Sequence, residues 1–145
     1  MPSMPFDRLL HKLMREYKQH MEEHLAPQLT AGQFQVMEYM LTNEGPFKPS
    51  DMLDYLATTP AAVTTLLDRM ERGGLIQRQR DEKDRRIVWI AMTRKGREAG
   101  EHGMELKNQF FQTCLDRISS HNQQLLLFLL NKVVHENGSD SSGNP

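Results

Sequence analysis

Apolar residues recur every three or four positions along most of the chain, which is the spacing of amphipathic α-helices. The first such stripe runs from about Phe6 to Leu25 and predicts a helix that ends before Pro27. A second helix is expected to begin after Thr30, because the Thr30 hydroxyl and the Gln33 side chain have the spacing of a capping box. The N-terminal part of the chain is therefore predicted to contain two helices joined by a short turn.

Two shorter helices are predicted in the middle of the chain. The first spans residues 49–56 and begins with a proline, which suits a first helical turn because its nitrogen needs no partner there. The second spans residues 60–72, and Thr59 is placed to cap its start. The glycine pair at 73–74 is expected to end this helix, since glycine adopts the left-handed conformation easily.

After the glycine pair, the pattern changes to one that predicts strands. Residues 75–80 and 86–92 are expected to form a β-hairpin, and the second run is rich in β-branched and aromatic side chains. The residues between them, Asp81 to Arg85, form a highly charged hairpin tip. Thr93 then suits the cap of a long helix that extends to about Ile118.

The last predicted helix is apolar around its whole circumference. Ser120 and Gln123 have the spacing of a capping box at its start, and every residue from Leu125 to Leu130 is apolar. A monomer of this size would leave part of such a helix exposed, and exposed apolar patches mark interfaces. We therefore expect self-association through this region. The polar residues 137–145 that follow are expected to form a disordered tail.

Together these elements predict a mainly α fold with a small β-hairpin wing. Two short helices followed by a basic hairpin are the layout of a winged helix-turn-helix, in which the second helix can enter a DNA major groove. We expect one domain over residues 1–136, with the winged helix-turn-helix at about 30–96. The flanking segments, about 1–28 and 97–136, are predicted to form a helical dimerisation lobe.

Composition restricts the class of protein only broadly. The chain has 145 residues, of which 26% are charged and 38% hydrophobic, as in ordinary globular domains. No apolar run is long enough for a membrane span, and the N-terminus lacks the pattern of a secretory signal. The single cysteine, Cys114, cannot form an internal disulfide. These features favour a cytoplasmic protein that has no contact with a membrane.

The charge is distributed unevenly along the chain. Residues 69–97 contain ten Lys and Arg against four Asp and Glu, a net charge of +6, whereas the remaining residues carry −7. A basic segment within an acidic body is typical of a surface that binds a polyanion. A solvated charged face is the alternative interpretation of the same pattern.

The side chains of the second short helix suit an approach to DNA bases. Ala61, Ala62, Thr64 and Thr65 are small, and threonine methyl and hydroxyl groups can contact thymine methyls, bases or phosphates. The hairpin tip carries Lys83 and Arg85, which can reach phosphates or a minor groove. An ordinary helical corner would explain the helix pair alone, but the adjoining basic hairpin favours binding of double-stranded DNA.

Four motifs in this region give the chain a more specific resemblance. Leu29-Thr30 with Gln33-Phe34 is similar to LTxxQF, and the segment from Asp68 to Arg78 is similar to DRLExxGLIxR. Residues 81–86 match DxxDRR, and residues 92–96 match LTxKG with methionine in place of leucine. The same four motifs occur in this order in the MarR family of transcription regulators. The chain resembles this family across residues 29–96.

The resemblance implies a role for each residue of the predicted surface. One set lies on or beside the DNA-facing surface of the second short helix: Thr59, Ala61, Ala62, Thr64, Thr65 and Arg69. Lys83, Arg85 and Arg86 belong to the wing, where we expect Asp84 to pair with Arg86 and leave Arg85 for DNA. Thr65 occupies a position where many relatives have an arginine, so the base preference of the helix does not follow from the resemblance.

The resemblance also implies a homodimer that binds a palindromic operator, usually represses transcription and responds to a small-molecule effector. His11, Met14 and Tyr17 on the first helix are candidates to line an effector pocket. The alternative is that this methionine-containing stripe belongs to the ordinary core.

Other functions have weaker support in the sequence. His20 and His24 are four residues apart on one helix, and a third ligand from His102 or Glu105 would give a zinc-responsive regulator of the same fold. A winged helix that binds a protein partner is a second alternative. No phosphate-binding glycine loop, nucleophile elbow or other catalytic motif is present, so we expect neither an enzyme nor a bound cofactor.

Overall fold

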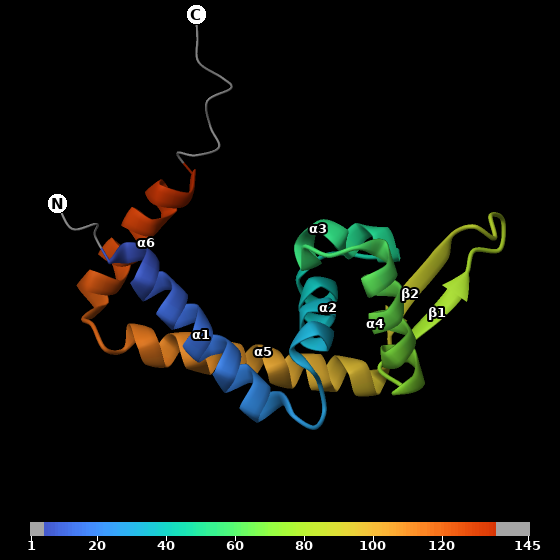
Figure 1. Cartoon of the computed structure of the whole chain (residues 1–145), viewed down its shortest axis with the longest axis horizontal. Coiled ribbons are helices and arrows are strands. Elements are labelled where there is room, and N and C mark those ends of the chain that lie inside the picture. The colour runs from blue at the N-terminus through green and yellow to red at the C-terminus, as the bar shows by residue number, and fades with distance from the viewer. Residues whose placement is uncertain (1–4, 136–145) are drawn as a thin grey trace, which may run out of the picture. The chain divides into compact units, whose positions relative to one another are not determined.

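A computed structural model of the chain describes residues 5–135 and confirms the predicted mainly α fold with one antiparallel hairpin (Figure 1). The elements, in chain order, are α1 (Phe6–Leu25), α2 (Ala31–Thr42), a 3-10 helix η1 (Pro49–Met52), α3 (Leu53–Leu56), α4 (Pro60–Arg72), β1 (Ile76–Arg80), β2 (Val88–Met92), α5 (Arg94–Leu115) and α6 (Ser120–His135).

The chain divides into two compact units between Asn108 and Gln109, and α5 crosses this division. The first unit contains α1 to α4, the hairpin and most of α5, and the second contains the end of α5 and α6. The predicted organisation as one domain over residues 1–136 stays a prediction, and the predicted tail at 137–145 lies outside the described residues.

Side-chain caps fix the helix starts that the sequence indicates. The Thr30 hydroxyl accepts a hydrogen bond from the Gln33 amide, and the Gln33 side chain accepts one from the Thr30 amide, both at 3.1 Å. Thr59 accepts from the amide of Ala62 at 3.2 Å. Each bond satisfies an amide that the first helical turn leaves without a partner, so these predicted helix boundaries are confirmed.

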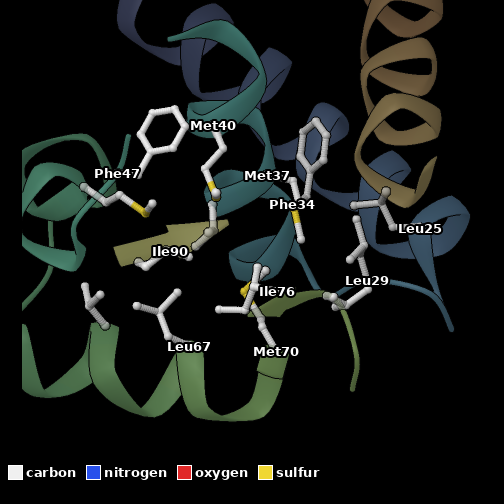
Figure 2. Close-up of a cluster of buried hydrophobic side chains, with 14 of the residues drawn as sticks. Leu25, Leu29, Phe34, Met37, Met40, Phe47, Leu67, Met70, Ile76 and Ile90 are labelled. Carbon is white, nitrogen blue, oxygen red and sulfur yellow. The ribbon is translucent and has the colours of Figure 1, made fainter. Parts of the chain in front are cut away.

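The core of the first unit joins the helix-turn-helix to the hairpin (Figure 2). Helix α2 and helix α4 contribute one buried face each, and both strands add an isoleucine. These buried side chains include Met37 and Met40 from α2, Leu67 and Met70 from α4, Ile76 from β1 and Ile90 from β2. The shared core holds α4 and the hairpin in one compact body, because burial of each face depends on the others.

Three buried glycines line one face of α5. Gly96, Gly100 and Gly103 are spaced by four and three residues, so they lie on the same side of the helix. A Cβ atom on Gly96 would be 1.9 Å from the carbonyl oxygen of Leu75, and one on Gly103 would be 2.5 Å from the Phe34 ring. The absence of side chains therefore allows α5 to approach α2 and the start of the hairpin closely.

Two predicted boundaries were wrong, by two and three residues. Strand β2 begins at Val88 and not at Arg86, because the Ile87 amide donates to the Asp84 carbonyl and closes a turn there. Helix α5 ends at Leu115, where the amide of Ile118 donates back only three residues. The hydrogen bonds of this tight turn replace the last helical turn that periodicity predicts.

The cap of α6 also differs from the expectation. Ser119 precedes the helix, and its hydroxyl accepts a hydrogen bond from the Asn122 amide at 3.2 Å, so Ser120 is the first helical residue and not the cap. The Gln123 side chain donates to the carbonyls of Leu115 and Ile118, which joins α6 to the end of α5 within the second unit.

Helix α6 is apolar and exposed, as its sequence predicts. Its side chains at Leu127, Phe128 and Val134 are 56%, 57% and 68% exposed. Within residues 5–135, no helix combines the length and the hydrophobicity required to cross a membrane.

Candidate nucleic-acid interface

Helix α4 presents one apolar face to the core and one small, polar face to solvent. Val63, Leu67 and Met70 are buried. The exposed set comprises Thr59, Ala61, Ala62, Thr64, Thr65 and Arg69, which are the residues that the sequence places on the DNA-facing surface. A helix surface of this kind can approach base edges closely, because five of these six side chains have at most two heavy atoms beyond Cβ.

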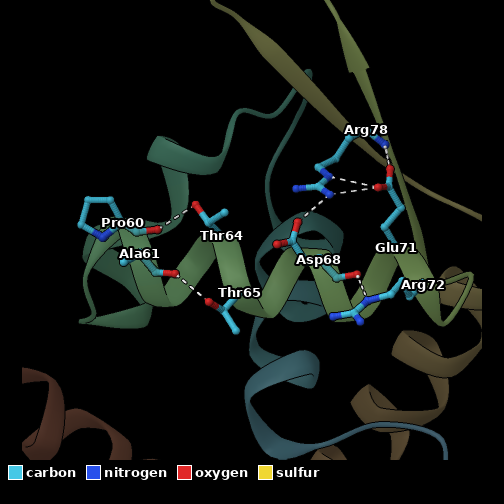
Figure 3. Close-up of polar contacts among 8 residues, drawn as sticks. All are labelled: Pro60, Ala61, Thr64, Thr65, Asp68, Glu71, Arg72 and Arg78. Atoms are coloured by element: carbon cyan, nitrogen blue, oxygen red, sulfur yellow. Dashed lines mark hydrogen bonds and ion pairs between the residues drawn. The ribbon is translucent and has the colours of Figure 1, made fainter.

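Two of the three threonines in this surface, Thr64 and Thr65, already use their hydroxyl protons. Thr64 donates to the Pro60 carbonyl at 3.0 Å and Thr65 donates to the Ala61 carbonyl at 3.1 Å (Figure 3). In this rotamer each hydroxyl oxygen retains a lone pair that can accept a hydrogen bond. The surface thus offers methyl groups and acceptors, which suit thymine methyls and the amino groups of cytosine or adenine.

The hairpin is attached to the helix-turn-helix through β2. We call β1, β2 and the connecting residues 81–87 the wing, and residues 81–87 its tip. The amide of Ile90 donates to the carbonyl of Phe47 at 2.9 Å, and both side chains are buried. The strands pair antiparallel with Arg78 opposite Ile90, so Arg78 lies at the centre of β1 and faces a buried residue of β2 across the ladder.

Asp81 organises the tip of the wing. Its carboxylate accepts hydrogen bonds from the amides of Lys83 and Asp84, at 3.0 and 2.8 Å, and from the Trp89 indole at 3.0 Å. These bonds, led by that of Trp89, hold the pKa of the Asp81 carboxyl below its usual range. The sequence analysis missed this role, although an aspartate at the start of a turn is itself a signal.

The expected ion pair between Asp84 and Arg86 is present. The Arg86 Nε and Nη2 atoms lie 3.0 and 3.1 Å from the two carboxylate oxygens of Asp84. The same pair lowers the pKa of the Asp84 carboxyl. The Arg85 carbonyl accepts from Arg80, which adds a third constraint on the tip.

Two cations of the tip remain available for a partner. The side chains of Lys83 and Arg85 are exposed, and within residues 5–135 neither has an ion-pair partner. Asp84 and Arg86 neutralise one another within the same loop. The geometry thus presents Lys83 and Arg85 on a loop that its own carboxylates hold in place.

Arg78 links the wing to α4, a contact that the sequence analysis did not identify. Its guanidinium lies 2.6 Å from an Asp68 carboxylate oxygen and 3.0 Å from Glu71 (Figure 3). The Glu71 carboxylate also accepts a hydrogen bond from the backbone amide of Arg78 at 2.9 Å. The hydrogen bonds between Arg78 and Glu71 lower the pKa of the Glu71 carboxyl and raise that of Arg78.

A second polar cluster lies in the first unit, away from α4. Glu38 of α2 is 8% exposed and accepts hydrogen bonds from the Tyr55 phenol and the Lys107 ammonium. Burial, and then the charge of Glu38, raise the pKa of Tyr17 to about 12. Tyr17 is therefore close to this cluster, whereas His11 and Met14, the other predicted pocket residues, are exposed on α1.

An open cavity of about 460 Å³ occurs elsewhere in the first unit. It lies between the loop after α1, the start of the hairpin and α5, and its lining contains none of the three predicted pocket residues. The lining residues are Pro27, Gln28, Leu75, Lys95, Glu98, Ala99 and His102.

The histidines of α1 do not assemble with further metal ligands. The rings of His20 and His24 stack with centroids 4.2 Å apart, and His24 Nδ1 lies 2.8 Å from the His20 carbonyl oxygen. In the part of the chain that the structure describes, no three His, Cys, Asp or Glu side chains gather as a possible metal site. Among residues 5–135, neither His102 nor Glu105, the candidates for a third ligand, joins such a group.

Sequence comparison relates the chain to bacterial transcriptional regulators. A sequence model of the MarR family matches residues 29–88. The uncharacterized HTH-type transcriptional regulator YwhA of Bacillus subtilis is 32% identical over 84 residues, which cover 58% of this chain and 60% of that protein. Transcriptional regulator HosA of Escherichia coli is 25% identical over 131 residues, covering 89% and 96%.

Solved structures give the same relationship. A mutant of MarR from E. coli, crystallised with operator DNA, has a TM-score of 0.71 and 26% identity over 90% of this chain and 94% of that one. The complex of Staphylococcus aureus MepR with DNA has a TM-score of 0.78 over 92% and 99% of the chains. At 23% identity the second likeness concerns the fold alone.

Proposed function

Because the chain belongs to the MarR family of helix-turn-helix transcriptional regulators, and therefore to a class of regulators and not enzymes, we propose that it is a dimeric, effector-responsive repressor that binds a palindromic DNA site. One observation carries the proposal most directly. The small polar face of α4 lies in the same compact unit as a wing tip whose Lys83 and Arg85 have no ion-pair partner among residues 5–135.

The two parts of this surface have different roles in the proposed complex. Helix α4 enters the major groove, where Thr64 and Thr65 contact bases through methyl groups and hydroxyl oxygens. The wing follows the backbone or an adjacent minor groove, where Lys83 and Arg85 meet the negative potential of the phosphates. Base contacts thus determine sequence preference, and the wing contributes most of the salt-dependent affinity.

Arg85→Ala tests the role of the wing. We expect this variant to bind a selected DNA duplex about tenfold more weakly, a change of about 1.4 kcal/mol. Arg15→Ala removes an equal charge from the exposed surface of α1 and serves as the control, with affinity close to that of the wild type. Fluorescence anisotropy measures both, and circular dichroism checks that both are folded.

The dependence on salt separates two forms of wing contact. If Arg85 binds phosphate, the variant binds all DNA sequences more weakly by the same factor. The salt slope, which is the slope of log affinity against log salt concentration, then falls in magnitude by about one for each wing in the complex. If it enters the minor groove, the loss depends on A·T content at that position. An Arg85→Ala variant that matches Arg15→Ala on every duplex would refute both forms.

We propose that the exposed apolar side chains of α6 are covered by a second copy of the chain. Leu127 and Phe128 are more than half exposed, and a two-fold symmetric pair would place two α4 helices about 34 Å apart, one DNA turn. A dimer mass in sedimentation equilibrium at micromolar concentration is expected, and a monomer at that concentration would contradict this part of the proposal.

The effector is proposed to act through Tyr17 and its neighbours His11 and Met14. Tyr17 is half-buried near Glu38, while the two other side chains are accessible on α1. A hundredfold loss of DNA affinity requires the effector to favour the non-binding state by about 2.7 kcal/mol. Titration of the DNA complex with phenolic and fatty acids tests this, and an equal response of wild type and Tyr17→Phe would exclude Tyr17 from the site.

A further inference from the structure

Arg78 is bound to α4 at two points along the helix axis. Asp68 and Glu71 are three residues apart on one face of α4, and the Arg78 guanidinium lies 2.6 Å from the first and 3.0 Å from the second. Glu71 also accepts the main-chain amide of Arg78 at 2.9 Å. Side chain and backbone of this strand residue are therefore both fixed to the helix.

A change at this attachment would alter the direction in which the wing extends. Arg78 lies at the centre of β1, and Lys83 at the tip is five residues further along the chain. Five extended residues span about 16 Å, so a rotation of the wing of about 10° at Arg78 moves the tip by about 3 Å. A displacement of that size exceeds the tolerance of a hydrogen bond or a close phosphate contact.

The same residues present an apparent electrostatic conflict with DNA binding. Asp68 and Glu71 place two negative charges next to the basic surface of α4 and the wing. Among residues 5–135, the Arg78 guanidinium is the one cation that forms ion pairs with them. Through long-range electrostatics alone, these two carboxylates would lower the affinity for DNA, because they repel phosphate. A role in geometry explains their presence without requiring that they attract DNA.

We propose that Arg78, with Asp68 and Glu71 as its partners, is a positioning residue that sets the angle between α4 and the wing, so that both reach one DNA duplex together. The inference rests on the proposed function, because it concerns the geometry of DNA binding. It assigns no DNA contact to Arg78 itself, whose side chain is 27% exposed.

Glu71→Ala distinguishes geometry from electrostatics, with Glu82→Ala as the matched control. Each substitution removes one negative charge, but Glu82 lies exposed at the tip and has no ion-pair partner among residues 5–135. If only charge matters, both variants bind a selected duplex as tightly as the wild type or more tightly. If Glu71 positions the wing, Glu71→Ala binds about tenfold more weakly and Glu82→Ala does not.

The salt slope is the second readout. A general loss of stability lowers the fraction of folded protein but does not change this slope. Glu71→Ala removes no cation, yet disengagement of the wing is expected to lower the slope by about one for each lost phosphate contact, while Glu82→Ala retains the wild-type slope. Thermal unfolding monitored by circular dichroism defines the folded fraction. If Glu71→Ala is unfolded at the assay temperature, Asp68→Asn, a smaller change in the same contact, replaces it.

The outcomes separate this inference from the function on which it rests. Absence of salt-dependent DNA binding by the wild type would overturn the proposed function. Wild-type binding together with equal affinities and equal slopes for folded Glu71→Ala and Glu82→Ala would overturn the positioning role alone. Weaker binding and a lower slope for Glu71→Ala only would support it.

Discussion

Gly96→Ala is expected to destabilise the protein by about 3 kcal/mol or more, at the upper end of the range for overpacked cores. The new Cβ atom would lie 1.9 Å from the Leu75 carbonyl oxygen and 3.0 Å from the Met37 side chain. The first contact is to backbone, which cannot relieve the overlap by changing a rotamer. Helix α5 must therefore move away from the hairpin, and urea unfolding measures the cost.

Gly32→Ala in α2 is the control for this prediction. A Cβ atom there would be 3.8 Å from the Leu66 side chain, which is an ordinary van der Waals contact. Because alanine loses less backbone entropy than glycine on forming a helix, this variant is expected to gain about 0.5 kcal/mol. Equal stabilities of the two variants would show that close approach of α5 does not depend on Gly96.

Lys107→Met is expected to lower the free energy of unfolding by about 2 kcal/mol. The variant leaves the Glu38 carboxylate, which is 8% exposed, with the Tyr55 phenol as its remaining hydrogen-bond donor among the described contacts. This expected decrease in the free energy of unfolding is smaller than for a fully buried pair because the Lys107 side chain is 32% exposed. Chemical denaturation at neutral pH measures the difference.

A double substitution identifies the origin of that loss. Glu38→Gln in the Lys107→Met background removes the buried charge and keeps an oxygen that can accept from Tyr55, so part of the stability is expected to return. Lys12→Met on the exposed surface of α1 controls for the loss of one lysine. If Lys107→Met is no less stable than Lys12→Met, the ion pair contributes nothing measurable.

The helices and the exposed face of α4 could be predicted because their signals are local. The caps at Thr30 and Thr59 depend on residues three positions away, and the exposed face of α4 follows from its helical period. Each prediction concerns contacts within one turn of helix, and sequence spacing determines these directly.

The contacts missed by the sequence analysis join residues whose proximity depends on the fold. Glu38 and Lys107 are 69 positions apart, and no spacing rule pairs them. Arg78 and Glu71 are separated by only seven residues, but the chain changes from helix to strand between them, so neither period applies. The start of β2 was misplaced because a local turn closes before it, and the cap of α6 was misplaced by one residue because the Ser119 hydroxyl accepts the bond at the helix start.

The central claim is that α4 and the wing bind double-stranded DNA. The most direct test selects a duplex from a random pool with the wild-type protein and then measures its affinity as a function of salt concentration. Arg69, Lys83 and Arg85 from each of two protomers would neutralise about six phosphates. We therefore expect a palindromic site and a slope of log affinity against log salt of about −5. Selection of no duplex, or an affinity that does not change with salt, would contradict it.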